Sequence, residues 1–364
     1  NLLIAHDGKI IYERSIGYHD LENAEKLTKE SRFRVGSITK MFTTALVLKN
    51  VEDGKLSLDQ NLSDFYPQVK NADKITISNL LQHRSGIHNF TNDEVYMTYY
   101  QNPQTEEFLV EKIVDGGSDF EPDSKGDYSN SNFVLLTFIL EKVNGKSYAD
   151  LIKENITYPL KLNDTYVGKS PGLKEAKSYQ FVDGNWVFEP YADMSVPLGA
   201  GAIVSTTEDL AKFIRGLFAG DIISQHSLEL MKEVFGRGIF QYPYGDKKSF
   251  GHSGGIDGFR SQLGYFPDEK LTIVRLSNGL NYNANEIDLA MLHSYFGNEV
   301  DVPNFTSVTL SEEELDQYVG EYSSEQIPLV ITFVREGNVK PKETTNSSFL
   351  WLGQFSNLLL KREK

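Results

Sequence analysis

Apolar positions at helical spacing predict two long helices in the first half of the chain. Between residues 38 and 48, apolar side chains recur every three or four positions, and Gly54 then supplies a stop signal. The apolar run 133–140 ends in the same way, at Asn144-Gly145. A turn-rich stretch, 121–127, precedes this second run, so a loop leads directly into the second helix.

Two hairpins are predicted where short apolar stretches flank turn residues. Residues 2–6 and 9–18 flank Asp7-Gly8, a two-residue turn signal. Residues 261–266 and 271–276 flank a Pro-Asp-Glu-Lys turn. Because the strands at both ends must pair to avoid open edges, we expect a mixed α/β (α+β) fold. It has one antiparallel sheet flanked by helices, with an all-helical region inserted.

Ser37 and Lys40 carry the first candidate chemistry, at the start of the first predicted helix. They are three residues apart, so they share a helix face and can touch. A lysine amine held against an apolar helix loses hydration, which favours its neutral form. A neutral amine beside a hydroxyl is a general base beside a nucleophile, which predicts acyl transfer through a serine ester. Such a pair alone is weak, since about one arises by chance in a chain of this length.

Tyr128 and Asn130 lie where a loop enters the second predicted helix. A phenol there can relay a proton to a leaving group. A carboxamide can accept a hydrogen bond from an amine and donate one to a substrate carbonyl. The plainer interpretation is a helix cap beside a packed tyrosine.

Residues 252–255, His-Ser-Gly-Gly, form the third candidate motif, just before the second predicted hairpin. Small residues on a strand let a ligand approach the backbone closely. A backbone N–H of this segment and that of Ser37 can together form an oxyanion hole. The plainer interpretation is a glycine-rich loop with an exposed histidine.

The three motifs occur in the order found in one family. The chain resembles serine β-lactamases of class C and the related D-alanyl-D-alanine peptidases, D-aminopeptidases and esterases over roughly its first 300 residues. The segments that carry the resemblance are 33–40, 75–86, 197–210 and 251–259.

The resemblance assigns a role to each motif residue. It makes Ser37 the acylated nucleophile, Lys40 its base, Tyr128 the proton relay and Asn130 the group that positions Lys40 and the substrate amide. It makes His252, Ser253 and Gly254 the substrate-binding strand, and the N–H groups of Ser37 and Gly255 the oxyanion hole.

Two residues depart from the family pattern. Asp123 follows Pro122 where relatives usually carry glycine. His252 stands where many relatives have lysine, a permanent cation that suits a substrate carboxylate. Histidine is mostly neutral near pH 7, which favours the peptidase, D-aminopeptidase or esterase branches over an efficient β-lactamase.

A rival motif makes Ser253 the nucleophile. Residues 251–255 also satisfy G-x-S-x-G, the nucleophile elbow of α/β hydrolases. That elbow requires a buried strand before the serine and a helix after it. The preceding segment 245–250 is too polar for such a strand, and the residues that follow alternate like strands, so this alternative is remote.

Composition limits the classes of partner and cofactor. A net charge of −15 disfavours nucleic acid and anionic membranes, and no apolar run approaches the ~20 residues that span a bilayer. Without cysteine there is no disulfide, thiolate zinc site or thiol nucleophile. The seven histidines are scattered, with His83 and His88 interpreted as structural. We expect neither a metal nor another cofactor.

The expected organisation is a catalytic domain, residues 1–298, a linker, 299–310, and a short β-rich C-terminal unit, 311–364, interpreted as an abbreviated barrel. Its predicted strands are 330–333 and 349–352. No signal peptide precedes the first strand. Since the resembling proteins carry an export signal, we expect a periplasmic, extracellular or cell-surface protein whose leading residues are absent from this sequence.

Two functions stay open at this level. The first is a serine hydrolase that acts on D-amino-acid peptides, amides, esters or β-lactams, with a peptidoglycan stem peptide among the candidate substrates. The second is a catalytically poor member that binds penicillin-like ligands as a sensor or scaffold. The sequence gives no prediction of oligomeric state.

Overall fold

The computed structural model describes residues 1–169, 174–233, 235–300, 302–303, 311–324, 327–336, 338–341 and 361–362. The chain divides into two compact units, Asn1–Tyr282 and Asn283–Lys364. The division falls before helix α9 (Ala284–Phe296), whereas the boundary predicted from the sequence, at residue 298, follows that helix. All residues of the three motifs lie in the first unit.

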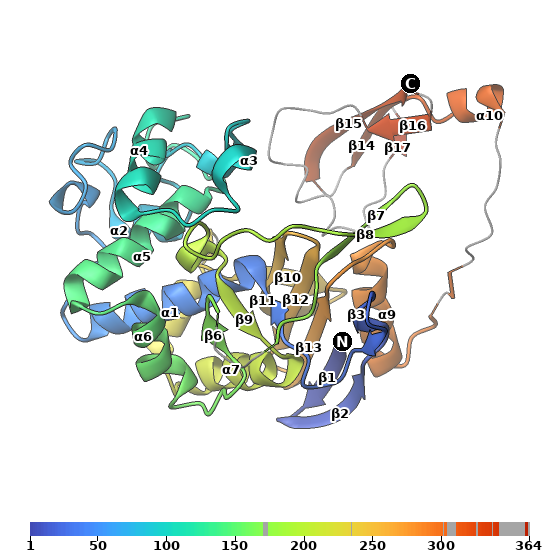
Figure 1. Ribbon diagram of the computed structural model, residues 1–364, viewed down its shortest axis with the longest axis horizontal. Coiled ribbons are helices and arrows are strands. Elements are labelled where there is room, and N and C mark those ends of the chain that lie inside the picture. The colour runs from blue at the N-terminus through green and yellow to red at the C-terminus, as the bar shows by residue number, and fades with distance from the viewer. Residues whose placement is uncertain are drawn as a thin grey trace. The chain divides into compact units, whose positions relative to one another are not determined.

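A six-stranded antiparallel sheet forms the centre of the first unit, in the order β10-β11-β12-β13-β1-β2 (Figure 1). Its strands are β1 (Leu2–His6), β2 (Lys9–Arg14), β10 (Phe240–Tyr244), β11 (Lys247–Ile256), β12 (Phe259–Phe266) and β13 (Leu271–Ser277). Both predicted hairpins are confirmed, as β1–β2 and β12–β13. Strand β1 also pairs with β13, so the expected antiparallel sheet joins strands from both ends of the unit.

Two helices confirm the apolar runs read from the sequence, and they lie side by side (Figure 1). Helix α1 spans Thr39–Glu52, and α5 spans Asn130–Asn144 and ends at Gly145, whose φ of 63° suits a left-handed cap. Around them lie α2 (Ile77–Leu81), α3 (Tyr96–Tyr99), α4 (Glu106–Gly116) and α6 (Tyr148–Ile152), while α7 (Thr207–Ala219) packs on the sheet and α8 (Gln225–Met231) packs on α7.

Short elements connect the sheet to the helices. Three small sheets pair β3 (Tyr18–Asp20) with β4 (Glu25–Lys26), β9 (Ile203–Ser205) with both β5 (Phe33–Arg34) and β6 (Tyr166–Val167), and β7 (Tyr179–Val182) with β8 (Asn185–Phe188). The helical turns are η1 (Gly36–Ile38), η2 (Leu62–Asp64), η3 (Phe90–Asn92), η4 (Lys153–Thr157) and η5 (Leu198–Ala200).

Helix α1 is buried on nearly every side along its first ten residues, which is more than its apolar spacing predicts. Polar side chains on it are therefore inside the protein and need partners. Thr43 meets this need, because its hydroxyl donates to the Gly199 carbonyl at 2.7 Å and lies 2.7 Å from the Tyr148 hydroxyl. Lys40 is the only charged residue among these first ten residues of α1. Its surroundings set the chemistry described below.

The second unit contains α9, α10 (Glu312–Asp316) and a four-stranded antiparallel sheet in the order β16-β15-β14-β17. Its strands are β14 (Gly320–Ser324), β15 (Ile327–Glu336), β16 (Asn338–Pro341) and β17 (Lys361–Arg362). The predicted strand 330–333 is part of β15, whereas the predicted strand 349–352 lies outside the described residues. Among the helices that the structure describes, none is long and apolar enough to cross a membrane.

Candidate active site

The turn that carries Ser37 rests directly on strand β11. Gly36 has a φ of 52°, and a Cβ atom there would come within 2.8 Å of the Gly255 amide nitrogen. A Cβ atom at Gly254 would overlap the Val35 carbonyl oxygen, which also accepts a hydrogen bond of 2.8 Å from the Ser261 hydroxyl. Glycine at both positions lets the two backbones meet. The small size of Gly254 therefore accommodates the protein's own chain at Val35, and its role in the approach of a ligand stays a prediction.

Ser37 and Lys40 meet as their spacing predicts, although Ser37 lies in the 3₁₀ turn η1 just before α1. The Lys40 Nζ atom lies 3.1 Å from Ser37 Oγ. It also lies 2.8 Å from Asn130 Oδ1 and 2.8 Å from the Ala200 carbonyl oxygen. An amide oxygen and a carbonyl only accept hydrogen bonds, so they take two N–H groups of the amine. In a neutral amine the remaining lone pair then faces the Ser37 hydroxyl.

Burial favours this neutral form. The Lys40 side chain is fully buried, and burial holds the pKa of its amine well below the usual value. None of its three hydrogen-bond partners is a carboxylate that would restore the charge. Lys40 thus has the position of a general base for Ser37, and its lowered pKa favours the neutral form that this role needs.

Tyr128 also contacts the serine hydroxyl, with its Oη atom 2.8 Å from Ser37 Oγ. Burial raises the pKa of this phenol, and the hydrogen bond to Ser37 opposes the change only in part. Tyr128 is therefore a neutral O–H group near pH 7, which suits a proton donor or relay. The His83 ring stacks on the Tyr128 ring with 4.3 Å between centroids, and its Nδ1 accepts a 3.1 Å hydrogen bond from the Ser129 amide.

Asn130 is held by two side chains, one from the residue just before η3 and one from η3 itself. Its Nδ2 atom donates to Thr91 Oγ1 at 3.0 Å, and its backbone N–H donates to Asn89 Oδ1 at 3.0 Å. Thr91 in turn donates to Asn89 Oδ1 at 3.0 Å. These contacts fix the rotation of the amide, so its Oδ1 points at the Lys40 amine.

His252 lies on β11 beside the Tyr128 ring, at 6.4 Å between centroids, and is buried. Its Nδ1 lies 2.5 Å from the Ser253 carbonyl, which can only accept, so the ring hydrogen is on Nδ1 and Nε2 is an acceptor. Burial, followed by the proximity of Lys40, lowers the pKa of His252 to about 3. The position that holds lysine in many relatives is thus uncharged here.

Ser253 lies inside strand β11, and β11 turns into strand β12. A nucleophile elbow needs a strand that ends at the serine and a helix that follows it. The local structure around Ser253 has neither feature, which excludes the α/β-hydrolase alternative. The N–H groups of Ser37 and Gly255 remain the predicted oxyanion hole, supported by the close backbone approach at Gly36.

Three further groups at the site had no role assigned from the sequence. The Ala200 carbonyl belongs to η5, in a segment that carried the family resemblance but offered no functional side chain. Thr91 is one of many threonines, and its position in the sequence gives no signal. His83 was interpreted as structural, and its stacking on Tyr128 connects it to the site.

Asp123, which stands where relatives usually carry glycine, adopts a φ of 67°. That left-handed conformation is the one that glycine adopts without strain. Its carboxylate accepts a 2.7 Å hydrogen bond from Arg84 Nε, which helps to hold the loop before Tyr128. Within the described residues there is no group of three or more His, Asp or Glu side chains that could hold a metal ion.

The sequence of this chain matches known proteins over most of its length. Residues 1–295 match the family described as Beta-lactamase. Penicillin-binding protein 4* of Bacillus subtilis (strain 168) is 28% identical over 337 residues, which cover 83% of this chain and 73% of that protein. Teichoic acid D-alanine hydrolase of Staphylococcus aureus is 28% identical over 246 residues, which cover 67% of this chain and 59% of that protein.

Solved structures share the fold. The octameric penicillin-binding protein homologue from Pyrococcus abyssi superposes with a TM-score of 0.75 and 26% identity, covering 92% of this chain and 81% of that one. D-amino acid amidase from Ochrobactrum anthropi SV3, in complex with L-phenylalanine, superposes with a TM-score of 0.68 and 27% identity, covering 76% of this chain and 86% of that one.

Proposed function

Because the chain belongs to the beta-lactamase family, we propose that it is a serine hydrolase that forms its covalent acyl-enzyme on Ser37. The observation that carries the proposal is the buried Lys40 amine, 3.1 Å from Ser37 Oγ, with its two other contacts made to fixed acceptors. This arrangement presents a lone pair to the hydroxyl before any substrate binds.

In the acylation step, Ser37 Oγ forms a bond to the substrate carbonyl carbon while its proton passes to Lys40. The carbonyl oxygen becomes an oxyanion and is bound by the N–H groups of Ser37 and Gly255. As the bond to the leaving group breaks, Tyr128 gives its proton to the leaving nitrogen or oxygen. The proton held by Lys40 then restores the phenol, so the site returns to its starting charge.

Deacylation is the same sequence with water in place of the leaving group. Lys40, neutral again, takes a proton from the attacking water. Tyr128 is the other candidate base for this step, by resemblance to the family. Its raised pKa favours the role of proton relay over that of base.

We propose that the acyl donor is an ester or amide of a D-amino acid. The neutral His252 supplies no permanent charge for the carboxylate that β-lactams carry beside the scissile bond. Its Nε2 is a buried acceptor without a partner among the described residues, which suits a substrate amine or hydroxyl that donates a hydrogen. The names of two relatives, a D-amino acid amidase and a teichoic acid D-alanine hydrolase, agree with this substrate class.

A turnover panel tests the proposal. D-alanyl ester, D-phenylalanine amide, a D-Ala-D-Ala peptide and nitrocefin are compared at equal concentration, with Ser37→Ala and Ser253→Ala as paired variants. We expect the highest kcat/KM for the ester or amide, a mass increase on the peptide that contains Ser37, and activity retained in the Ser253 variant. Acylation of Ser37→Ala contradicts the mechanism, and rapid penicillin acylation without turnover of any ester, amide or peptide favours a sensor.

We also propose that the protein acts outside the cytoplasm. The relatives named as a penicillin-binding protein and a teichoic acid D-alanine hydrolase support this location. Fractionation of cells that express the full gene, followed by immunodetection, tests this location. Recovery of the protein from the cytoplasmic fraction alone contradicts it.

A further inference from the structure

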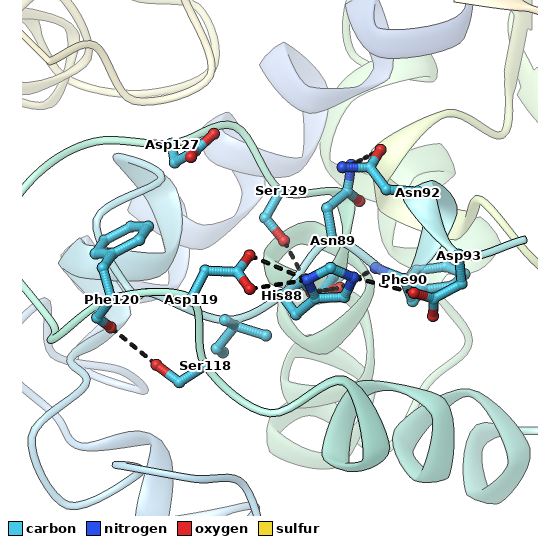
Figure 2. Close-up of polar contacts among 12 residues, drawn as sticks. His88, Asn89, Phe90, Asn92, Asp93, Ser118, Asp119, Phe120, Asp127 and Ser129 are labelled. Atoms are coloured by element: carbon cyan, nitrogen blue, oxygen red, sulfur yellow. Dashed lines mark hydrogen bonds and ion pairs between the residues drawn. The ribbon is translucent and has the colours of Figure 1, made fainter. Parts of the chain in front are cut away.

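His88 is held between two carboxylates from different loops (Figure 2). Its Nδ1 lies 3.0 Å from both carboxylate oxygens of Asp119, and its Nε2 lies 3.0 Å from Asp93 Oδ1. A neutral imidazole has only one N–H group, so both contacts are hydrogen bonds only when the ring is an imidazolium. With both carboxylates ionised, the geometry therefore favours a positive charge on His88.

The groups packed around His88 also favour that charge. The ring lies against Gly116 at the C-terminus of α4, the negative end of that helix dipole, and the His88 N–H donates to the Gly117 carbonyl. On the segment before α5, Ser129 faces the His88 carbonyl, and Asp127 is paired with Lys125. Although burial lowers the pKa of His88, the hydrogen bonds that its ring donates to Asp119 and Asp93 leave this pKa raised above its ordinary value.

The backbone and neighbours of His88 connect this charge to the catalytic groups. The His88 carbonyl accepts a 2.6 Å hydrogen bond from the Ser131 hydroxyl, which itself accepts from the Phe90 amide at 3.2 Å. The next residue, Asn89, accepts from the Asn130 backbone N–H at 3.0 Å. His88 thus helps to hold the segment 88–91 in place. Asn89 and Thr91 of the same segment orient the Asn130 amide, which contacts Lys40.

We propose that His88 is a pH-dependent positioning residue whose imidazolium clamps Asp93 and Asp119 and thereby holds Asn130 against Lys40. The role rests on the proposed acyl transfer at Ser37. When the ring loses its proton, one carboxylate faces a nitrogen lone pair, the two repel, and that side of the clamp opens. The rate of acylation then falls on the alkaline side because Asn130 no longer holds the Lys40 amine in line with the hydroxyl.

The kinetic test compares wild type with His88→Arg and His88→Gln. Arginine is a permanent cation that can donate to both carboxylates, whereas a neutral glutamine can satisfy only one. We expect His88→Gln to acylate about tenfold more slowly at pH 6, with KM little changed. We expect His88→Arg to recover to within about threefold and to lose the alkaline decline that wild type shows. If the acylation rate of His88→Arg declines at the same alkaline pH and to the same extent as that of wild type, the proposal is wrong.

Nuclear magnetic resonance separates this inference from the proposed reaction. With labelled histidine and asparagine, we expect the His88 ring to titrate above its ordinary pKa and the Asn130 side-chain amide signals to shift over the same pH range. In Asp119→Asn, a half-exposed position, both titrations move to lower pH. If Asn130 signals do not follow His88, the inference is wrong whether or not Ser37 is acylated. If they do but wild type gives no Ser37 adduct, only the proposed reaction fails.

Discussion

Replacing Asn130 with aspartate asks whether Lys40 acts as a neutral base. The change keeps the shape of the side chain but places a carboxylate where the amide oxygen lies 2.8 Å from the Lys40 amine. With an effective dielectric constant of about 20, the attraction between the two charges is about 6 kcal/mol. The cost of burying the carboxylate offsets part of this attraction.

The net result is a higher pKa for Lys40. An opposite charge at this range typically moves a pKa by about 1–3, or ~1.4–4 kcal/mol. At pH values below the wild-type pKa of Lys40, the fraction of neutral amine then falls by about ten- to a thousandfold. Since acylation needs the neutral form, the acidic limb of the rate profile moves to higher pH, and activity partly returns in alkaline buffer.

Single-turnover acylation by a fluorescent penicillin or a chromogenic ester, followed from pH 5 to 10, measures this effect. Asn130→Leu is the matched control, because it removes the hydrogen bond without adding a charge. It slows acylation while leaving the acidic limb near its wild-type position, well below the usual lysine pKa. If Asn130→Asp has the wild-type limb, that limb does not report the protonation of Lys40, and another group is the base.

Three further changes test separate parts of the site. Tyr128→Phe removes the hydroxyl that relays the proton and should lower kcat by about 10²–10⁴ while the variant stays folded by circular dichroism; an unchanged kcat rules out the relay. Gly254→Ala should lose about 1–3 kcal/mol of unfolding free energy in urea, because its Cβ overlaps Val35, whereas Gly126→Ala, with its nearest neighbour at 3.7 Å, should lose little. His252 has a lowered pKa of about 3, so the unfolded chain binds its proton first and stability falls by up to ~1.4 kcal/mol per pH unit as pH drops from about 6.5. His252→Gln should reduce that acid loss, and equal losses in both proteins refute the assignment.

Much of the site could be predicted because its functional groups are side chains that lie a few residues apart in the sequence. Ser37 and Lys40 are one turn apart, and their contact follows from helical geometry once a helix is placed there. Tyr128 and Asn130 were placed by a loop that enters an apolar run, and α5 begins at Asn130. In each case a local pattern decided which face of the helix the functional group occupies.

The remaining parts of the site depend on contacts between distant segments. The Ala200 carbonyl, 160 residues after Lys40, is a backbone atom that every residue type supplies. The packing that requires glycine at position 254 involves Val35 and is set by the way η1 lies on β11. The clamp at His88 needs Asp93 and Asp119 on separate loops, and nothing in their spacing indicates that they meet.

Residues from distant parts of the chain also set the time at which activity appears during synthesis. The turn that carries Ser37 packs on β11, and strand β1 pairs with β13 (Leu271–Ser277), which is synthesised much later. A ribosome-bound chain that has emerged only as far as α8 already contains Ser37 and Lys40. It still lacks strand β11, on which the turn that carries Ser37 rests. We therefore expect newly made protein to lack the proposed activity until most of it has been translated, and a chain truncated before residue 251 to escape labelling by an acylating probe.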